Sequence, residues 1–465
     1  MADWLNRLLN FKRGELKLAL LSAAFFFCLL CGYFFLRPVR DAMGVSRGMG
    51  ELRWLFIVTS ITALVFVVAF GGVVSRLNRR RFIPIAYFFV IVCLLIFSSL
   101  LVFDGATGGG LIGSDAQTGT SRFVGYTFYV WLSVINLFAT SIFWAFMVDI
   151  FDVDQGKRLF PFIGIGGTLG GLVGGYATRQ IASLTDSVYL PAGLMLTGAT
   201  LFAAAILIML LLDRTATRSD HSKLDVSGGQ DQARSGARAK VGGSAIDGLV
   251  AVVRSPYLLG IGGYIIMMAI SNTMIYFTQA NLVLNESDSF SGFIANFALF
   301  DVLAQSATLL TQMFVTTHLI RKLGVGVTLA VLPLVTTAGF AVLALWPTLG
   351  VMAIFQALHR ATRYAVSRPA RETLFSVVPA SEKYKAKPII DVFLYRGGDV
   401  AGAGIDGLFR ALGLSLSWLA AATVPIAGAW GVLSFALGRT QGRKAGLLEN
   451  DSDNQEEEGE VGGLH

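Results

Sequence analysis

Two arginines close the first long apolar run of the chain, in the stretch YFFLRPVRDAMG that begins at Tyr33. Arg37 and Arg40 are three residues apart, so on a helix both guanidinium groups lie on the same face. A guanidinium group binds phosphate or carboxylate through two parallel hydrogen bonds. Pro38 is expected to break the helix between them and to free backbone carbonyl groups. The pair is therefore a candidate clamp for an anion; the alternative is that both side chains reach the membrane surface with Asp41 as their partner.

Other charged residues fall inside apolar segments, where a charge costs ~2.5 kcal/mol or more near the bilayer centre unless it meets water or a partner. Arg360 and Arg363 share one helix face, and no acidic residue lies within a helical turn of them, so they are candidates for anion binding. Arg396 and Asp399 also share a face, and they either form a structural pair or take part in solute binding. The remaining polar residues of this kind are Asp149, Asp301, Gln305 and Asp391.

The sequence shows no arrangement of residues suited to catalysis or to a metal. Cys28 and Cys31 have the spacing of a metal motif, but no second pair accompanies them, so packing explains them better. The stretch FPFIGIGGTLGGLVGG, which begins at Phe160, lacks the Gly-Lys-Ser/Thr ending of a phosphate-binding loop. Its glycines recur every four residues, which favours close helix packing. We expect neither enzymatic activity nor a cofactor.

The composition indicates an integral membrane protein. Of the 465 residues 54% are hydrophobic and 14% charged, and the mean hydropathy is +0.65; a soluble protein of this size needs more charge to cover its surface. The net charge of +7 raises the alternative of a nucleic-acid partner. Most of the basic residues flank apolar segments, however, so topology explains them better and the expected partner is the lipid bilayer.

Apolar runs of about 20 residues, the length that spans a bilayer, recur twelve times. The predicted spans are 17–36, 54–75, 83–103, 124–147, 159–182, 189–213, 257–278, 292–318, 324–346, 349–370, 387–409 and 414–437. They predict an N-terminal six-helix half (1–213), a flexible cytoplasmic linker (214–246), a C-terminal six-helix half (247–438) and a disordered acidic tail (439–465).

The basic residues also predict the orientation and the fold. Most of the 37 lysines and arginines lie in the terminal segments and in every second loop between the predicted spans, all of which fall on the same side of the membrane. Basic residues are enriched on the cytoplasmic side, so both termini are expected in the cytoplasm. The halves repeat, since Gly166, Gly167 and Gly171 correspond to Gly397, Gly398 and Gly402 at a constant offset. The expected fold class is therefore all-α, with twelve transmembrane helices in two six-helix halves, as in transporters built from two parallel repeats around a midplane cavity.

Three stretches resemble the nucleotide carriers (ATP/ADP translocases) of plastids and obligate intracellular bacteria, a family related to the major facilitator superfamily. They are LRPVRDAMG from Leu36, FWAFMVDIFDVDQGKRLFPFIG from Phe143 and RPARETLFSVVPASEKYKAKPIIDV from Arg368. The resemblance implies exchange of anionic nucleotides across a membrane. It would give Arg40 the role of the family's phosphate-binding basic residue and Asp149 that of its acidic residue in the fourth span.

The resemblance also reaches the eleventh span. Lys387 and Asp391 would match the lysine and aspartate that enter this span in the family. Asp399 stands where the family has a lysine, and the stretch SNTMIYFTQANLV, from Ser271, lacks the family's acidic residue of the seventh span. Like charges repel strongly in a cavity of low dielectric constant, so a smaller phosphate-bearing metabolite or another organic anion is an alternative substrate.

Together these features predict a secondary transporter, an antiporter by resemblance, that moves an anionic, phosphate-bearing solute by alternating access. The alternatives are a membrane-bound enzyme acting on lipid-linked phosphates and a degenerate carrier that acts as a membrane scaffold or lipid-handling partner. No organelle-targeting segment is visible, so we expect a bacterial inner membrane as the location. The sequence does not predict the oligomeric state.

Overall fold

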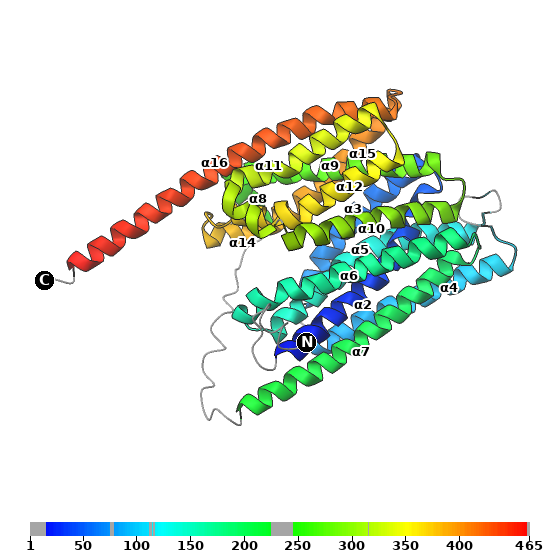
Figure 1. Ribbon diagram of the computed structural model, residues 1–465, viewed down its shortest axis with the longest axis horizontal. Coiled ribbons are helices and arrows are strands. Elements are labelled where there is room, and N and C mark those ends of the chain that lie inside the picture. Colours follow the sequence, from blue (N-terminus) through cyan, green and yellow to red (C-terminus); the bar gives the residue numbers. More distant parts are fainter. Residues whose placement is uncertain are drawn as a thin grey trace. The chain divides into compact units, whose positions relative to one another are not determined.

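The computed structural model of the chain describes residues 15–74, 79–110, 114, 117–224, 245–314 and 316–462. Within these ranges the regular structure is helical, without strands (Figure 1). Among the described residues, ten helices are long and apolar enough to cross a membrane. They correspond to the first nine predicted spans and the twelfth, so the predicted all-α membrane fold is confirmed.

The tenth and eleventh predicted spans are helical but are divided by π-helical turns. Their elements are α12 (Leu349–Ala361), η1 (Thr362–Ser367) and α13 (Arg368–Thr373), then α14 (Ala380–Pro388), η2 (Ile389–Leu394) and α15 (Tyr395–Ala411). A π-helical turn interrupts the regular hydrogen-bond ladder of an α-helix and frequently marks a functional site. The divided helices are not among the ten long apolar ones, so the count of twelve spans stays a prediction.

Several of the remaining helices extend beyond the predicted spans at one end or both. The remaining helices are α2 (Glu15–Val45), α3 (Met49–Val74), α4 (Arg79–Ala106), α5 (Gly119–Ile150), α6 (Val153–Leu184), α7 (Leu190–Leu224), α8 (Ala245–Arg254), α9 (Pro256–Glu286), α10 (Phe290–Phe314), α11 (Thr316–Leu345) and α16 (Leu416–Gly462). α7 enters the predicted linker, of which residues 225–244 lie outside the described ranges. α16 continues through most of the predicted tail, whose glutamates have good helix propensity.

Side chains at the N-terminal ends of α5 and α6 cap these two helices. The Thr118 hydroxyl accepts a hydrogen bond from the backbone N–H of Ser121 at 3.1 Å and caps α5. Asp152 and Gln155 form a capping box at the start of α6, in which each side chain bonds the other residue's backbone. The expected break at Pro38 is wrong, because α2 continues through it to Val45. A proline removes only one helix hydrogen bond, and the packing of α2 along α6 and α7 supports the rest of the helix.

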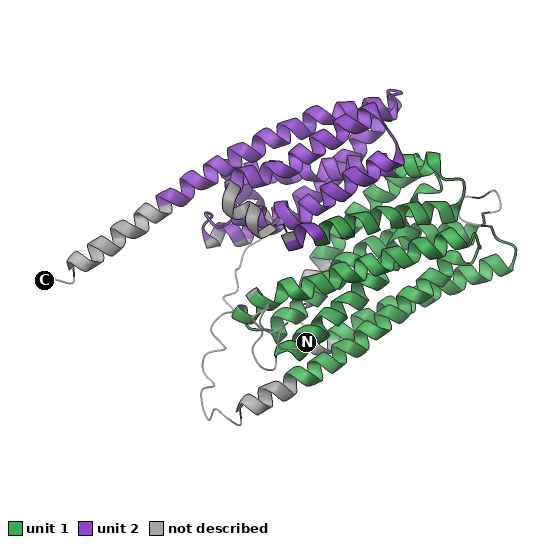
Figure 2. Cartoon of the chain, viewed as in Figure 1, with its two compact units in different colours: residues 1–239, 280–309 green, residues 240–279, 310–465 purple. Residues whose placement is uncertain are grey.

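The chain divides into two compact units (Figure 2). Unit 1 comprises Met1–Ala239 and Ala280–Leu309, and unit 2 comprises Lys240–Gln279 and Leu310–His465. Unit 1 therefore includes α10 as far as Leu309, although α10 follows the predicted linker in the sequence. The predicted domain boundaries, which follow the sequence repeat, stay a prediction.

Glycines bring paired helices into close contact in each unit. In α6, a Cβ on Gly166, Gly170 or Gly174 would collide with backbone atoms of α2. In α15, a Cβ on Gly398 or Gly402 would crowd residues of α9. Small residues at this spacing allow two backbones to approach closely in a membrane. The packing role that the sequence predicts for the glycines of α6 is confirmed, and the glycines of α15 make the same kind of close contact.

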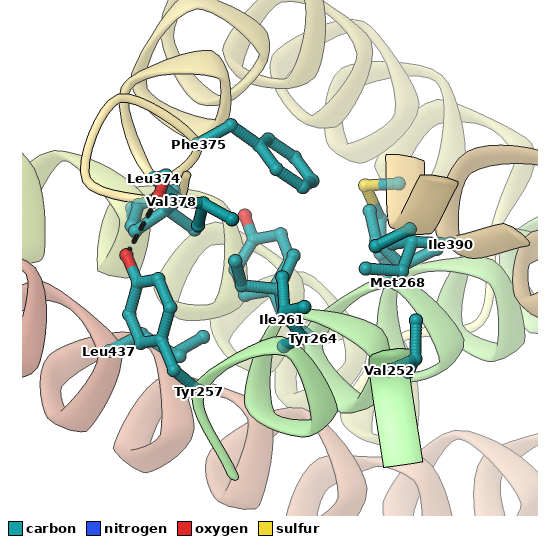
Figure 3. Packing of buried hydrophobic residues seen from close by; sticks show 14 of the residues in the cluster. Val252, Tyr257, Ile261, Tyr264, Met268, Leu374, Phe375, Val378, Ile390 and Leu437 are labelled. Carbon is teal, nitrogen blue, oxygen red and sulfur yellow. Dashed lines mark hydrogen bonds between the residues drawn. The ribbon is translucent and has the colours of Figure 1, made fainter. Parts of the chain in front are cut away.

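The core of unit 2 joins α9 to the segment after the first π-helical turn (Figure 3). The hydroxyl of Tyr257 donates to the carbonyl of Leu374 at 2.9 Å, and the ring of Tyr264 packs edge-on against Trp430 at 5.4 Å. The Tyr264 hydroxyl also bonds the hydroxyl of Ser367, at the end of η1, at 2.8 Å. These buried contacts fix η1 and α13 against α9.

Candidate functional site

A group of charged residues in unit 1, which we call the α2 charge cluster, contains Arg37, Arg40, Asp41, Ser133 and Asp301. Nη1 of Arg37 lies 2.5 Å from Oδ1 of Asp301, and its Nε lies 3.8 Å from Asp41. Arg40 bonds the same Asp41 through Nη2 at 2.5 Å and the hydroxyl of Ser133 through Nη1 at 3.1 Å. Three helices, α2, α5 and α10, therefore meet in this cluster.

The α2 charge cluster is buried and electrically balanced. The side chains of Asp41 and Asp301 are each only 3% exposed, and those of Arg37 and Arg40 are 17% and 13% exposed. Two arginines face two aspartates, and a buried carboxylate needs such a partner because its desolvation is costly. Both arginines contact Asp41, the partner that the membrane-surface alternative expects, and Arg37 also contacts Asp301 of α10.

A second group, in unit 2, surrounds the end of the second π-helical turn. We call it the π-turn cluster; its members are Thr273, Arg363, Tyr395, Arg396 and Asp399. Arg396 pairs with Asp399 at 3.0 Å, as the sequence allows, and the Thr273 hydroxyl donates to the same carboxylate at 3.4 Å. Arg363, in η1, donates to the hydroxyl of Tyr395 at 2.8 Å. The carbon centres of the Arg363 and Arg396 guanidinium groups lie 5.7 and 5.9 Å from the centroid of the Tyr395 ring.

The π-turn cluster carries more positive than negative charge. In the part of the chain that the structure describes, no carboxylate lies within ion-pair distance of Arg363. Its partners are the rings of Tyr364 and Tyr395 and the Tyr395 hydroxyl. Two guanidinium groups thus share the single carboxylate of Asp399, which already pairs with Arg396. An anionic solute would supply the negative partner that the Arg363 guanidinium group lacks.

Comparison with known proteins points to one transporter family. The model of the TLC ATP/ADP transporter family matches residues 122–348. ADP,ATP carrier protein 1 of Chlamydia trachomatis is 23% identical over 90% of this chain and 87% of its own length. The plastidic ATP/ADP-transporter of Solanum tuberosum is 22% identical over 89% of this chain and 72% of its own. The predicted resemblance to the ATP/ADP carriers is confirmed.

The chain is a multi-pass membrane transporter. Its fold is similar to that of the nucleoside transporter NupG, as seen in a crystal structure of a point mutant, with a TM-score of 0.58 and 14% identity over 90% of this chain and 98% of that one. This similarity confirms the major-facilitator-type fold. The family consists of carriers, so a hydrolytic or redox enzyme is not indicated.

In this transporter, Lys387 and Asp391 belong to ion pairs around α13 and α14 that are separate from the ion pair of the π-turn cluster. Nζ of Lys387 lies 2.5 Å from Glu372, and Arg371 lies 3.7 Å from Asp391 and 3.9 Å from Glu372. Arg371 is 16% exposed, whereas Lys387 and Glu372 are more open, at 35% and 44%. Two cations face two carboxylates, so these pairs add no net charge.

Two predicted site residues, Asp149 and Arg360, belong to neither cluster. Asp149 is exposed near the end of α5, and a rise of 1.5 Å per residue places it about 24 Å along the helix from Ser133. Arg360 is partly buried on α12, directly before η1 and three residues ahead of Arg363. The roles predicted for all nine site residues stay predictions.

The structure adds residues that the sequence did not single out. Ser133, Thr273 and Tyr395 are uncharged, so hydropathy gives them no special status. Arg371 and Glu372 lie in the RPARETLF stretch, whose likeness to the family indicated the segment but not their contacts. The one available signal for Tyr395 was its position beside Arg396, since an aromatic ring next to an arginine can hold a cation.

Proposed function

We propose that this transporter exchanges anionic, phosphate-bearing solutes, nucleotides such as ATP and ADP among them, by alternating access. The observation that supports this most directly is Arg363, a cation in a predicted span whose described partners are uncharged phenol groups. A charge in this position is expensive unless it meets water or an opposite charge. A phosphate group, which an arginine binds through two hydrogen bonds, meets that requirement.

Tyr395 would position Arg363 for this role. The phenol oxygen holds one nitrogen of the guanidinium group at 2.8 Å and leaves the other nitrogens to a solute. Arg396 lies on the same ring, so both cations are oriented by one aromatic side chain. Asp399 would limit the total positive charge and with it the number of phosphate groups that bind well.

The ion pair of Arg37 and Asp301 would act as a gate. α2 lies before the predicted linker and α10 after it, so this pair joins helices of opposite sequence halves. In alternating access the two halves rock against each other, and contacts between them break in one state and form in the other. A balanced pair suits this role because each partner finds water when the contact opens.

Energy for transport would come from exchange or from a gradient, since the sequence contains no phosphate-binding loop that could hydrolyse ATP. The distribution of lysine and arginine supports cytoplasmic termini, and relatives in Chlamydia support a bacterial inner membrane as the location. The family match favours transport over a scaffold role.

The test is exchange in proteoliposomes preloaded with ADP, with labelled ATP outside. We expect counter-exchange that Arg363→Ala abolishes, whereas Arg443→Ala, which removes an exposed arginine of α16, leaves it unchanged. Inorganic phosphate, AMP and a dicarboxylate as unlabelled competitors define the solute class. Equal exchange by both variants would refute the role of Arg363, and no exchange of any anion in the panel would favour the scaffold alternative.

A further inference from the structure

Unit 1 contains an apolar cavity on the face that α3, α4 and α5 form together. Its volume is about 880 Å³. Its wall is made largely of aliphatic and aromatic side chains, among them Val58, Phe66, Ile85, Phe89, Val130 and Phe138. Four of these, Val58, Phe66, Ile85 and Phe89, are also exposed on the surface of the protein. The cavity therefore opens at the apolar surface of the protein, which faces the acyl chains of the lipids in a membrane.

One residue of the wall, Tyr126, connects this cavity to a pair of arginines. The guanidinium group of Arg47 lies over the Tyr126 ring at 4.3 Å, and that of Arg122 lies 5.7 Å from the same ring. The Tyr126 hydroxyl donates to Glu51 at 2.7 Å. Two cations and one carboxylate thus surround the end of the cavity, which leaves an excess of positive charge there.

The two arginines differ in their exposure. Arg122, in the first turn of α5, is exposed. Arg47 lies in the turn between α2 and α3, and all three of its side-chain nitrogens are buried without a hydrogen-bond partner among the described residues. A buried guanidinium group without hydrogen bonds is costly, and polar groups of this kind in native proteins are nearly always satisfied. Gly48, with φ of 90°, follows Arg47 in this turn, a conformation that glycine adopts without strain.

We propose that this cavity binds an anionic phospholipid, with its phosphate between Arg47 and Arg122 and its acyl chains in the apolar space. The phosphate oxygens accept hydrogen bonds from both guanidinium groups and satisfy Arg47. The exposed Arg122 meets the headgroup first, and the turn at Gly48 lets Arg47 approach it. Glu51 stays bonded to the phenol of Tyr126 and is thereby held away from the phosphate.

The position of the cavity on α5 links the lipid to transport. Trp131, Val134 and Phe138 of α5 line the cavity, whereas Ser133 is not part of its wall and, by the helical repeat, Tyr129 lies on the opposite side of the helix. Ser133 bonds Arg40, whose guanidinium group also lies 5.4 Å from the Tyr129 ring. A lipid that restrains α5 at the cavity wall therefore also restrains the residues of α5 that contact Arg40 in the α2 charge cluster.

The test is native mass spectrometry of the intact transporter with added phosphatidylglycerol or phosphatidylcholine of matched acyl chains. We expect tighter retention of phosphatidylglycerol, and a loss of roughly fivefold in its affinity for each arginine that is removed, in Arg122→Ala and in Arg47→Ala/Arg122→Ala. Arg443→Ala should behave as the unaltered protein. Val130→Trp, which fills the cavity, should weaken both lipids.

Three results would overturn the proposal: equal retention of both lipids, no effect of Arg122→Ala, or displacement of phosphatidylglycerol by inorganic phosphate at equal concentration. The last would identify a site for free phosphate that needs no acyl chain. If the double variant unfolds, Arg122→Ala and Val130→Trp still decide, because Arg122 is exposed and its removal leaves no buried group unpaired.

Discussion

Arg363 and Tyr395 are joined by a 2.8 Å hydrogen bond that connects the two divided helices of unit 2. Arg363 lies inside the π-helical turn η1, and Tyr395 directly follows the turn η2. π-helical turns shift the helical phase of the residues that follow them. The bond therefore depends on two local irregularities, and it holds a cation that has no carboxylate partner among the described residues.

Removal of this cation should abolish exchange while the fold persists. A hydrogen bond to a charged group contributes ~1.5–3 kcal/mol, so Arg363→Ala should weaken solute binding roughly 10- to 150-fold. Arg363→Lys keeps the charge but loses the two-point contact, and it should retain part of the activity. Affinity measured by thermal shift with ATP and ADP, beside uptake in proteoliposomes, provides the check.

Tyr395→Phe separates positioning from charge. This variant retains the ring under both guanidinium groups but loses the hydroxyl that orients Arg363. We expect solute binding to weaken by about 0.5–1.5 kcal/mol, the contribution of one hydrogen bond, which is less than the loss expected for Arg363→Ala. A loss as large as that of Arg363→Ala would mean that the hydroxyl itself contacts the solute.

Asp399 should set the preference among phosphate-bearing solutes. Asp399→Asn removes the only carboxylate of the π-turn cluster, and Asp399→Lys reverses its sign, so attraction for a polyphosphate should rise in that order. The measurement is competition by ATP, ADP and AMP for uptake, in which the ratio of ATP to AMP affinity should increase. Asp406→Asn is the matched control, since Asp406 pairs with Arg410 about two turns further along α15. An unchanged ratio in Asp399→Lys would place Asp399 away from the solute.

Hydropathy and spacing predicted much of this architecture from sequence. A membrane span needs about 20 apolar residues, and ten predicted spans appear as long apolar helices. Contacts within a helix follow from spacing as well, so the pair of Arg396 and Asp399 was predictable. The glycine ridges of α6 were predictable for the same reason.

Contacts between distant segments were not predictable in this way. Arg37 and Asp301 are 264 residues apart, and Arg363 and Tyr395 are 32 apart. Their pairing depends on which helix faces are packed together, and hydropathy does not encode that choice. The π-helical turns also escape a regular 3.6-residue pattern, because they are departures from it. Pro38 shows the opposite error, in which a local signal yields to the packing of α2.

The glycine ridge of α6 makes a prediction about stability. A Cβ on Gly170 would collide with the carbonyl oxygen of Phe27 in α2, whereas nothing lies within 4 Å of a Cβ on Gly164. Gly170→Ala should therefore destabilise the protein by about 1–3 kcal/mol, as overpacking does. Gly164→Ala should be neutral or stabilising, since alanine favours helix by up to ~1 kcal/mol. Thermal unfolding of the two variants in the same detergent decides, and equal melting temperatures would contradict the close approach of α6 and α2.

The proposed gate can be tested by a reversible covalent bond between α6 and α10. A Cβ built on Gly175 lies 3.3 Å from Cγ2 of Val302 and 3.6 Å from its backbone nitrogen. These contacts place the two residues side by side, and a disulfide forms where the Cβ atoms lie about 3.5–4.5 Å apart. Gly175→Cys/Val302→Cys, made in a background with Cys28, Cys31 and Cys93 replaced by alanine, joins helices on either side of the predicted linker. Oxidation should stop exchange, and a reductant should restore it.

The matched control joins two helices of the same sequence half. A Cβ on Gly32 of α2 lies 3.2 Å from Cβ of Leu201 in α7, slightly closer than in a typical disulfide, so Gly32→Cys/Leu201→Cys brings two cysteines together with only a small adjustment of the helices. Because α2 and α7 both precede the linker, they should move together, and this bond should leave exchange intact. Arrest by both disulfides would mean that any added rigidity stops transport. Exchange through an oxidised α6–α10 pair would show that this contact stays closed throughout the cycle, and Arg37 and Asp301 would then be a structural pair.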